Sequence, residues 1–172
     1  MAIESTMYEK RKLERQTVST SLEVYDSAQE LSEELQDLMK QAVEVRDQAY
    51  APYSKFKVGA AILLDNGEVV VGSNQENASY PSGLCAERTA VYYAGAKFPG
   101  SRILKIAITA RSLNQEITKP VPPCGACRQA LVEYEVKQKE AIELYFMGET
   151  GEVMKAASVA EILPLVFDSN CL

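Results

Sequence analysis

Three of the four cysteines lie in two short segments and could share one metal ion. Cys124 and Cys127 are three residues apart, and on the first turn of a helix this spacing puts both sulfurs on one side. Cys85 comes from a separate segment and supplies a third thiolate. Zinc suits such soft ligands, and three protein ligands leave its fourth tetrahedral position open, which is typical of a catalytic site.

A carboxylate accompanies these cysteines, because Glu87 follows Cys85 by two residues. Water on a zinc ion needs a base that takes its proton and an acid that delivers it. We expect Glu87 to do both in sequence. Arg88 lies one helical turn from Cys85 and is expected to donate to the sulfurs and withdraw negative charge, with Arg128 as a second candidate.

Plainer explanations exist for the same residues. The thiols could form a closed four-ligand zinc site or belong to the core, although the fourth cysteine, Cys171, lies near the C-terminus. Taken alone, Glu87 would be a solvated charge on a helix, and Arg88 would be a surface charge. An open metal position beside a carboxylate favours catalysis, because a purely structural zinc site requires neither.

The composition limits the classes of function. The chain has 172 residues, of which 47% are hydrophobic, and this suffices for a single domain with one core. Its formal net charge of −6 argues against a nucleic-acid partner. It has no histidine, which excludes Ser-His and Cys-His nucleophilic schemes. The sequence has neither an apolar run of roughly 18 residues nor a signal-peptide core, so we expect a cytoplasmic protein without membrane contact.

The residues that could do chemistry need helices to position them. Ser27 and Glu30 have the spacing of a capping box, and the apolar positions that follow recur at helical intervals until Pro52 ends the pattern. Two more helices are expected at 85–97 and 124–134. Both cysteine segments then lie at helix N-termini, where unpaired N–H groups and partial positive charge favour thiolates.

Runs rich in Val and Ile predict the strands of a sheet, and the tripeptide 65–67 (DNG) predicts a tight hairpin between the first two. The expected strands are 56–64, 68–72, 103–110, 142–147 and 152–155. A last short helix begins at Ser158, with Glu161 as its cap partner. The order of these elements predicts an α/β fold, a three-layer sandwich in which helices flank a mixed sheet of about five strands.

We divide the chain into an N-terminal extension, residues 1–26, and a catalytic domain, residues 27–172. The extension mixes charged residues with Thr, Ser and Val. Within it, residues 16–25 could form one strand or a lightly ordered arm.

Four stretches of the sequence resemble the cytidine deaminase family, and the similarity extends from about residue 50 to residue 167. The stretches are 56–61 (FKVGAA), 74–80 (NQENASY), 85–90 (CAERTA) and 123–129 (PCGACRQ). The resemblance implies the cytidine deaminase-like fold and the hydrolysis of cytidine or deoxycytidine to uridine or deoxyuridine and ammonia, a step of pyrimidine salvage.

The resemblance also implies roles for the metal-site residues. Cys85, Cys124 and Cys127 would hold one Zn²⁺ per subunit, and a zinc-bound hydroxide would attack the amine-bearing carbon. Glu87 would protonate the neighbouring ring nitrogen and then carry a proton to the leaving ammonia. Gln129 is placed with Arg88 and Arg128 among the residues that support the metal ligands.

The remaining matches imply contacts with a small pyrimidine nucleoside. Asn74 and Glu76 match positions that hydrogen-bond the ribose hydroxyls, although ordinary loop polarity would also explain them. Phe56 and Phe167 match aromatic positions that pack against the pyrimidine, with core packing as the plainer alternative for both.

Two further positions complete the implied substrate site. Ala86 belongs to the substrate-binding set, and Tyr80 is placed near the sugar. Tyr80 and Phe167 would each serve a neighbouring subunit, so we expect a homotetramer with active sites at its subunit interfaces.

Two other functions stay open at this point. A deaminase of an aminonucleoside antibiotic such as blasticidin shares the Cys-Ala-Glu and Pro-Cys-x-x-Cys elements, and a non-catalytic zinc-binding module could have kept the metal. The run 85–90 and Phe167 favour cytidine. Deaminases of nucleotides or nucleic-acid bases are disfavoured, because many use a histidine ligand. Gln75 replaces a more usual apolar residue, which could alter the substrate preference.

Overall fold

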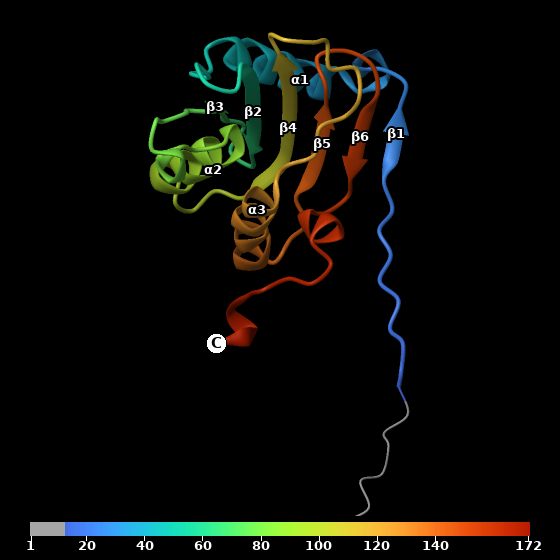
Figure 1. Ribbon diagram of the computed structural model, residues 1–172. Helices are drawn as coiled ribbons and strands as arrows, with labels where there is room; N and C mark the ends of the chain where they lie inside the picture. Colours follow the sequence, from blue (N-terminus) through green and yellow to red (C-terminus); the bar gives the residue numbers. More distant parts are fainter. Residues whose placement is uncertain (1–12) are drawn as a thin grey trace, which may run out of the picture.

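The computed structural model describes residues 13–172, and a mixed sheet of six strands runs through its centre (Figure 1). The strands are β1 (Glu23–Tyr25), β2 (Phe56–Leu64), β3 (Val69–Ser73), β4 (Ile103–Ser112), β5 (Glu143–Met147) and β6 (Val153–Ala156). Their order across the sheet is β1-β6-β5-β4-β2-β3. Strands β4 and β5 are parallel, and the other neighbouring pairs are antiparallel.

Three α-helices cover the two faces of this sheet in the described part of the chain, which confirms the predicted three-layer α/β fold. They are α1 (Glu33–Asp47), α2 (Ala86–Lys97) and α3 (Gly125–Gln138). In Figure 1, α2 and α3 lie on the near side of the sheet and α1 lies on the far side. None of these helices combines the length and apolar composition that a bilayer span needs.

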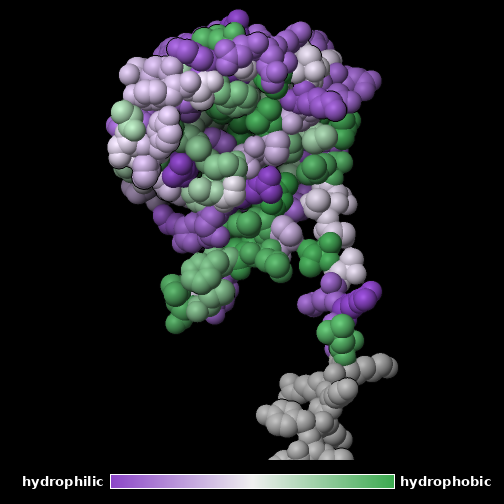
Figure 2. Space-filling model, in the orientation of Figure 1, coloured by the Kyte–Doolittle hydropathy of each residue, from purple (hydrophilic) through white to green (hydrophobic). Residues whose placement is uncertain are grey.

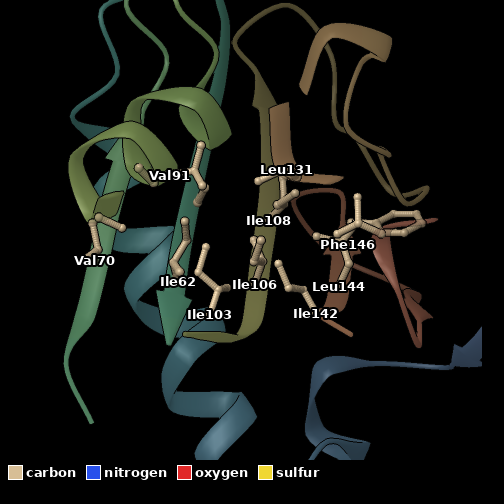
Figure 3. Close-up of a cluster of buried hydrophobic side chains, with 14 of the residues drawn as sticks. Ile62, Val70, Val91, Ile103, Ile106, Ile108, Leu131, Ile142, Leu144 and Phe146 are labelled. Atoms are coloured by element: carbon tan, nitrogen blue, oxygen red, sulfur yellow. The ribbon is translucent and has the colours of Figure 1, made fainter. Parts of the chain in front are cut away.

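Alternating side chains of the central strands build one core on each face of the sheet. Ile106 and Ile108 of β4 pack with Val91 and Leu131 against α2 and α3 (Figure 3), while Ala107 between them packs against α1. Each fully buried Ile, Leu or Val of this kind contributes roughly 1.5–3 kcal/mol. Packing against these strands therefore fixes the positions of the helix ends that carry the cysteines.

Glycines bring the two outer layers close to the sheet. A Cβ atom on Gly72 of β3 would lie 2.7 Å from the carbonyl oxygen of Ala86 and 2.6 Å from the backbone nitrogen of Ala90. A Cβ atom on Gly59 of β2 would lie 2.0 Å from the carbonyl oxygen of Ala42. The first turn of α2 therefore rests directly on β3, and this contact sets the position of the residues at the start of that helix.

The predicted start of the first helix is wrong. Residues Ala28–Glu30 form a short 3₁₀ helix, η1, and α1 begins only at Glu33. Leu31 has an extended backbone, and the Ser27 side chain makes no capping hydrogen bond. The Glu30 carboxylate instead accepts from the backbone N–H of Asp26 at 3.0 Å, so the capping-box spacing marks a turn before the helix.

The predicted last helix is a single 3₁₀ turn, η3 (Val159–Ile162). Its cap is formed as expected at Ser158, whose side chain accepts from the backbone N–H of Ala160. The Glu161 carboxylate accepts from the N–H of Ala157 at 2.9 Å. Two other 3₁₀ turns, η2 (Tyr80–Ser82) and η4 (Ser169–Cys171), occur in segments for which no helix was predicted.

The N-terminal extension adds the sixth strand. Residues 1–12 of the extension lie outside the described residues, and residues 13–22 are exposed and have no regular secondary structure. Residues 23–25 form β1, which pairs antiparallel with β6 at the edge of the sheet. Of the predicted segment 16–25, only these last three residues form a strand, because only they reach the free edge of β6.

Candidate active site

The three clustered cysteines lie at the N-termini of two helices. Cys85 is the N-cap residue of α2 and Cys124 is the N-cap residue of α3, each with an extended backbone. Cys127 follows in the first turn of α3 and is fully buried. The carbonyl groups of Cys85 and Cys124 accept the first helical hydrogen bonds, from Thr89 and Arg128. Both helices therefore direct unpaired N–H groups and partial positive charge toward the sulfurs.

The sulfur atoms are spaced as one small metal ion requires. Cys85 Sγ lies 3.9 Å from Cys124 Sγ, and Cys124 Sγ lies 3.5 Å from Cys127 Sγ. All three lie within 4.8 Å of one another. Tetrahedral zinc with bonds of about 2.3 Å to sulfur needs its ligands about 3.8 Å apart. The three thiols therefore have the spacing that would hold a zinc ion.

The charge on this cluster depends on its hydrogen bonds. A hydrogen bond from the Cys127 thiol, helped by one from Arg88, lowers the pKa of the Cys85 thiol to about 5. The Nη2 atom of Arg88 lies 3.5 Å from Cys85 Sγ. The pKa of Cys127 is raised, because its thiol donates to Cys85 and is buried. Metal binding at neutral pH must then release the proton that the Cys127 thiol holds.

Glu87 lies in the first turn of α2 and is almost completely buried, with 4% of its surface exposed. Burial raises the pKa of its carboxyl, a hydrogen bond from its own backbone N–H opposes that effect, and the negative charge of Cys85 adds to it. Its neighbour Ala86 is also buried, with its side chain in the core beneath α2. Any contact between Ala86 and a ligand must therefore involve the backbone atoms of Ala86.

A pocket of about 530 Å³ opens beside Cys85. Five of the predicted site residues line this pocket, namely Asn74, Glu76, Tyr80, Cys85 and Arg88. Its other walls include Asn77, which lies in the matched stretch 74–80 without an assigned role, and Tyr53, Ser54 and Leu84, which the sequence did not single out. Tyr53 and Ser54 had no motif of their own. Their position just before a predicted strand was the one available signal.

Asn74 and Glu76 shape the wall of this pocket. The Asn74 side chain accepts from the backbone N–H of Val58 at 2.7 Å and donates to the carbonyl of Phe56 at 2.9 Å. The Glu76 carboxylate accepts from the N–H groups of Tyr53 at 2.8 Å and Ser54 at 3.3 Å. A carboxylate has about four lone-pair directions, so Glu76 keeps capacity for a ligand hydroxyl.

Gln75 lies between these two residues and also lines the pocket. Its side-chain amide nitrogen donates to the hydroxyl of Ser73 at 3.2 Å. Its backbone pairs with that of Leu84 in both directions. Part of the polarity that this glutamine adds is therefore satisfied within the chain.

Of the three aromatic residues of the predicted site, one lines the pocket and two do not. Tyr80 is 74% exposed and lies at the pocket, where its ring meets that of Tyr53 edge to face at 5.9 Å. Phe56 is half-buried at the start of β2 and does not line the pocket. Phe167 is 59% exposed and lies in the C-terminal segment, outside the pocket lining of its own chain.

Arg128 and Gln129 contact backbone carbonyls near the metal site. Arg128, the second candidate for a contact with sulfur, instead donates to the carbonyls of Pro123 at 2.8 Å and Ile162 at 3.0 Å. Gln129 donates to the carbonyl of Phe167 at 2.8 Å. Arg128 can therefore support Cys124 through its neighbour Pro123, and the hydrogen bond to sulfur comes from Arg88.

This arrangement is that of a zinc-dependent hydrolase with an all-cysteine metal site, and comparisons with known proteins agree. The sequence model for the cytidine and deoxycytidylate deaminase zinc-binding region matches residues 32–141. The chain is 41% identical to the cytidine deaminase of Halalkalibacterium halodurans over 136 residues, which are 78% of this chain and 95% of that protein. The chain therefore belongs to the cytidine and deoxycytidylate deaminase family.

Solved structures support the same assignment. The crystal structure of cytidine deaminase from Burkholderia pseudomallei aligns with a TM-score of 0.66 and 39% identity, and covers 77% of this chain and 98% of its own. Cytidine deaminase from Mycobacterium tuberculosis aligns with a TM-score of 0.59 and 32% identity, covering 77% of this chain and 95% of its own. The fold and the family assignment therefore rest on independent comparisons.

Proposed function

We propose that this chain hydrolyses the exocyclic amine of cytidine and deoxycytidine, with Glu87 as the proton carrier, and so produces uridine or deoxyuridine and ammonia. The observation that carries the proposal is the buried carboxylate of Glu87, two residues from Cys85. The sulfur of Cys85 belongs to the three-thiol cluster, and Cys85 lines a pocket of about 530 Å³. We assign the catalytic work to residues 27–172.

Cys85, Cys124 and Cys127 would hold the zinc ion, which when bound supplies an acidified water for attack on the amine-bearing carbon. Glu87 accepts a proton from the attacking water and delivers it to the ring nitrogen next to that carbon. The same carboxylate then moves a second proton, from the hydroxyl group that the attack places on the carbon, to the exocyclic amine, which leaves as ammonia. Its burial serves both transfers, because competing bulk water is kept from the carboxyl group.

Arg88 balances the charge of the cluster. Three thiolates around a divalent cation leave a net charge near −1, which weakens the ability of the metal to acidify water. The hydrogen bond from Arg88 to Cys85 withdraws part of that charge. We assign Arg128 and Gln129 supporting roles. Arg128 binds a backbone carbonyl next to Cys124, and Gln129 binds a backbone carbonyl of the C-terminal segment.

The sugar of the nucleoside fits the polar wall of the pocket. Asn74 and Glu76 lie on that wall and would bind the ribose hydroxyls. The exocyclic amine must approach the cysteine cluster, so the base would lie between the sugar and Cys85. We assign the contact with Ala86 to its backbone, and Phe56 would pack against the pyrimidine from the start of β2.

We further propose a homotetramer with active sites at its subunit interfaces. Tyr80 and Phe167 are large aromatic residues that are 74% and 59% exposed, which leaves both accessible to a partner subunit. Phe167 lies outside the pocket of its own chain and would complete a neighbour's pocket. The free thiols suit a reducing compartment, which supports a cytoplasmic enzyme.

Two other functions are not favoured. The relatives described above are cytidine deaminases, which disfavours both an antibiotic deaminase and a non-catalytic zinc module. The deciding experiment follows the ultraviolet absorbance of cytidine, deoxycytidine and blasticidin S with zinc-loaded protein. Turnover of the nucleosides supports the proposal and sets the sugar preference. Turnover of blasticidin S alone, or none with stoichiometric zinc, would refute it.

A further inference from the structure

The C-terminal segment leaves the body of the protein after η3 and ends below α3 (Figure 1). Two large apolar residues lie within three positions of each other on it, Leu165 at 83% and Phe167 at 59% exposure. Figure 2 shows hydrophobic residues gathered on this projecting part of the surface. Apolar side chains grouped on a protruding segment mark a contact site, whereas scattered ones are ordinary.

The N-terminal part of α3 holds this segment at two points. Arg128 donates to the carbonyl of Ile162, where the segment begins, and Gln129 donates to the carbonyl of Phe167 at 2.8 Å. These two residues directly follow Cys127. The helix that carries two metal ligands therefore also sets the course of the C-terminal segment.

The chain is also held on the other side of Phe167. The Asp168 carboxylate accepts from the backbone N–H of Asn170 at 2.8 Å and from its side-chain amide at 3.1 Å, which caps η4. The backbone is thus tied to α3 at the carbonyl of Phe167, and from the next residue on it is ordered within the capped turn. Holding the backbone at both points restricts the directions in which the Phe167 ring can project, so less entropy is lost when the ring enters a contact.

We infer that Gln129 is a positioning residue, which holds the C-terminal segment so that Phe167 projects toward the pocket of a neighbouring copy. The inference rests on the proposed function of Phe167 in a neighbour's active site. Gln129 donates its hydrogen bond to the backbone of Phe167 and is not among the residues that line the pocket. Its loss should therefore weaken nucleoside binding and leave metal content and the chemical step in place.

The test compares three variants with the zinc-loaded full chain. Gln129→Leu keeps the size of the side chain but removes the donor, and it should raise KM for cytidine about 3- to 10-fold with kcat, zinc content and thermal midpoint retained. Phe167→Ala should raise KM at least as much. The double variant should have a KM no higher than that of Phe167→Ala alone, because both changes remove the same contact between Phe167 and the neighbouring pocket. Gln115→Leu, the same exchange on an exposed loop, should change nothing.

A second readout does not depend on turnover. The chain has no tryptophan, so Phe167→Trp introduces one tryptophan as a reporter, which is excited selectively over the tyrosines. Adding Gln129→Leu to this reporter should lower its anisotropy and shift its emission to the red. Additive KM effects in the double variant, or an unchanged reporter, would overturn the role of Gln129. Absence of cytidine turnover in the parent protein would instead overturn the proposed function, and the reporter would still decide this inference.

Discussion

Cys85 and Cys124 lie 39 residues apart in the chain, yet their sulfur atoms are 3.9 Å apart because each residue caps the N-terminus of a different helix. The two helices pack on the same face of the sheet. The metal site is therefore assembled by the packing of α2 and α3 on the strands. A change in that packing should alter the distances between the sulfur atoms.

The metal ligands should support the fold as well as the chemistry. Cys124→Ala should lose stoichiometric zinc and lower the thermal midpoint, because the free energy of metal binding stabilises the folded state. Cys171→Ala removes an exposed thiol of η4 and is the matched control, with both properties unchanged. Metal analysis beside a thermal melt checks both variants. Full zinc content in Cys124→Ala would mean that the ligands have been assigned wrongly.

Arg88 should matter to the metal site through its hydrogen bond with Cys85. Residues that orient metal ligands in this way typically account for 10- to 100-fold in affinity or activity, so Arg88→Gln should lose about that factor in kcat/KM. Arg88→Lys keeps the charge and should lose less. Steady-state kinetics at equal zinc content measures both variants. Activity of Arg88→Gln equal to that of the parent would show that Arg88 is a plain surface charge.

The close contact between α2 and β3 gives a test that substitutes no residue of the site. Gly72→Ala puts a methyl group 2.6–2.7 Å from backbone atoms of α2, and it should cost about 1–3 kcal/mol of unfolding free energy. Gly100→Ala is the control, since a Cβ atom there has no neighbour within 4 Å. Urea unfolding measures both variants. Equal stability of the two would show that α2 can move away from the sheet freely.

Glu76 should contribute to nucleoside binding and to the shape of the pocket. Glu76→Gln leaves one acceptor oxygen in place of two, so it cannot serve the N–H groups of Tyr53 and Ser54 and also bind a sugar hydroxyl as strongly. KM for cytidine should rise about 10-fold, the cost of one hydrogen bond to a charged group. An unaltered KM with an intact fold would remove Glu76 from the substrate site.

The local parts of this structure could be predicted from the sequence. The hairpin around residues 65–67 and the helix starts at Cys85 and Cys124 follow from short patterns, and the structure has both. The start of α1 was missed because Ser27 and Glu30 satisfy a turn as readily as a helix cap.

Long-range contacts could not be predicted in the same way. One of the two carbonyl partners of Arg128 lies 34 residues away, and the partner of Gln129 lies 38 residues away. A carbonyl group has no sequence signature, because every residue has one. The sequence thus predicted residues near the metal but not what their side chains bind, and Tyr53 and Ser54 joined the pocket only through folding.

The most direct test of the central claim measures turnover, zinc content and thermal midpoint together for Glu87→Gln and the parent chain. The exchange keeps the shape of the side chain and removes the group that carries the proton. We predict full zinc content, a midpoint at or above that of the parent, and cytidine turnover lower by a factor of about 10²–10⁴. Turnover equal to that of the parent would contradict the role of Glu87 and the mechanism built on it.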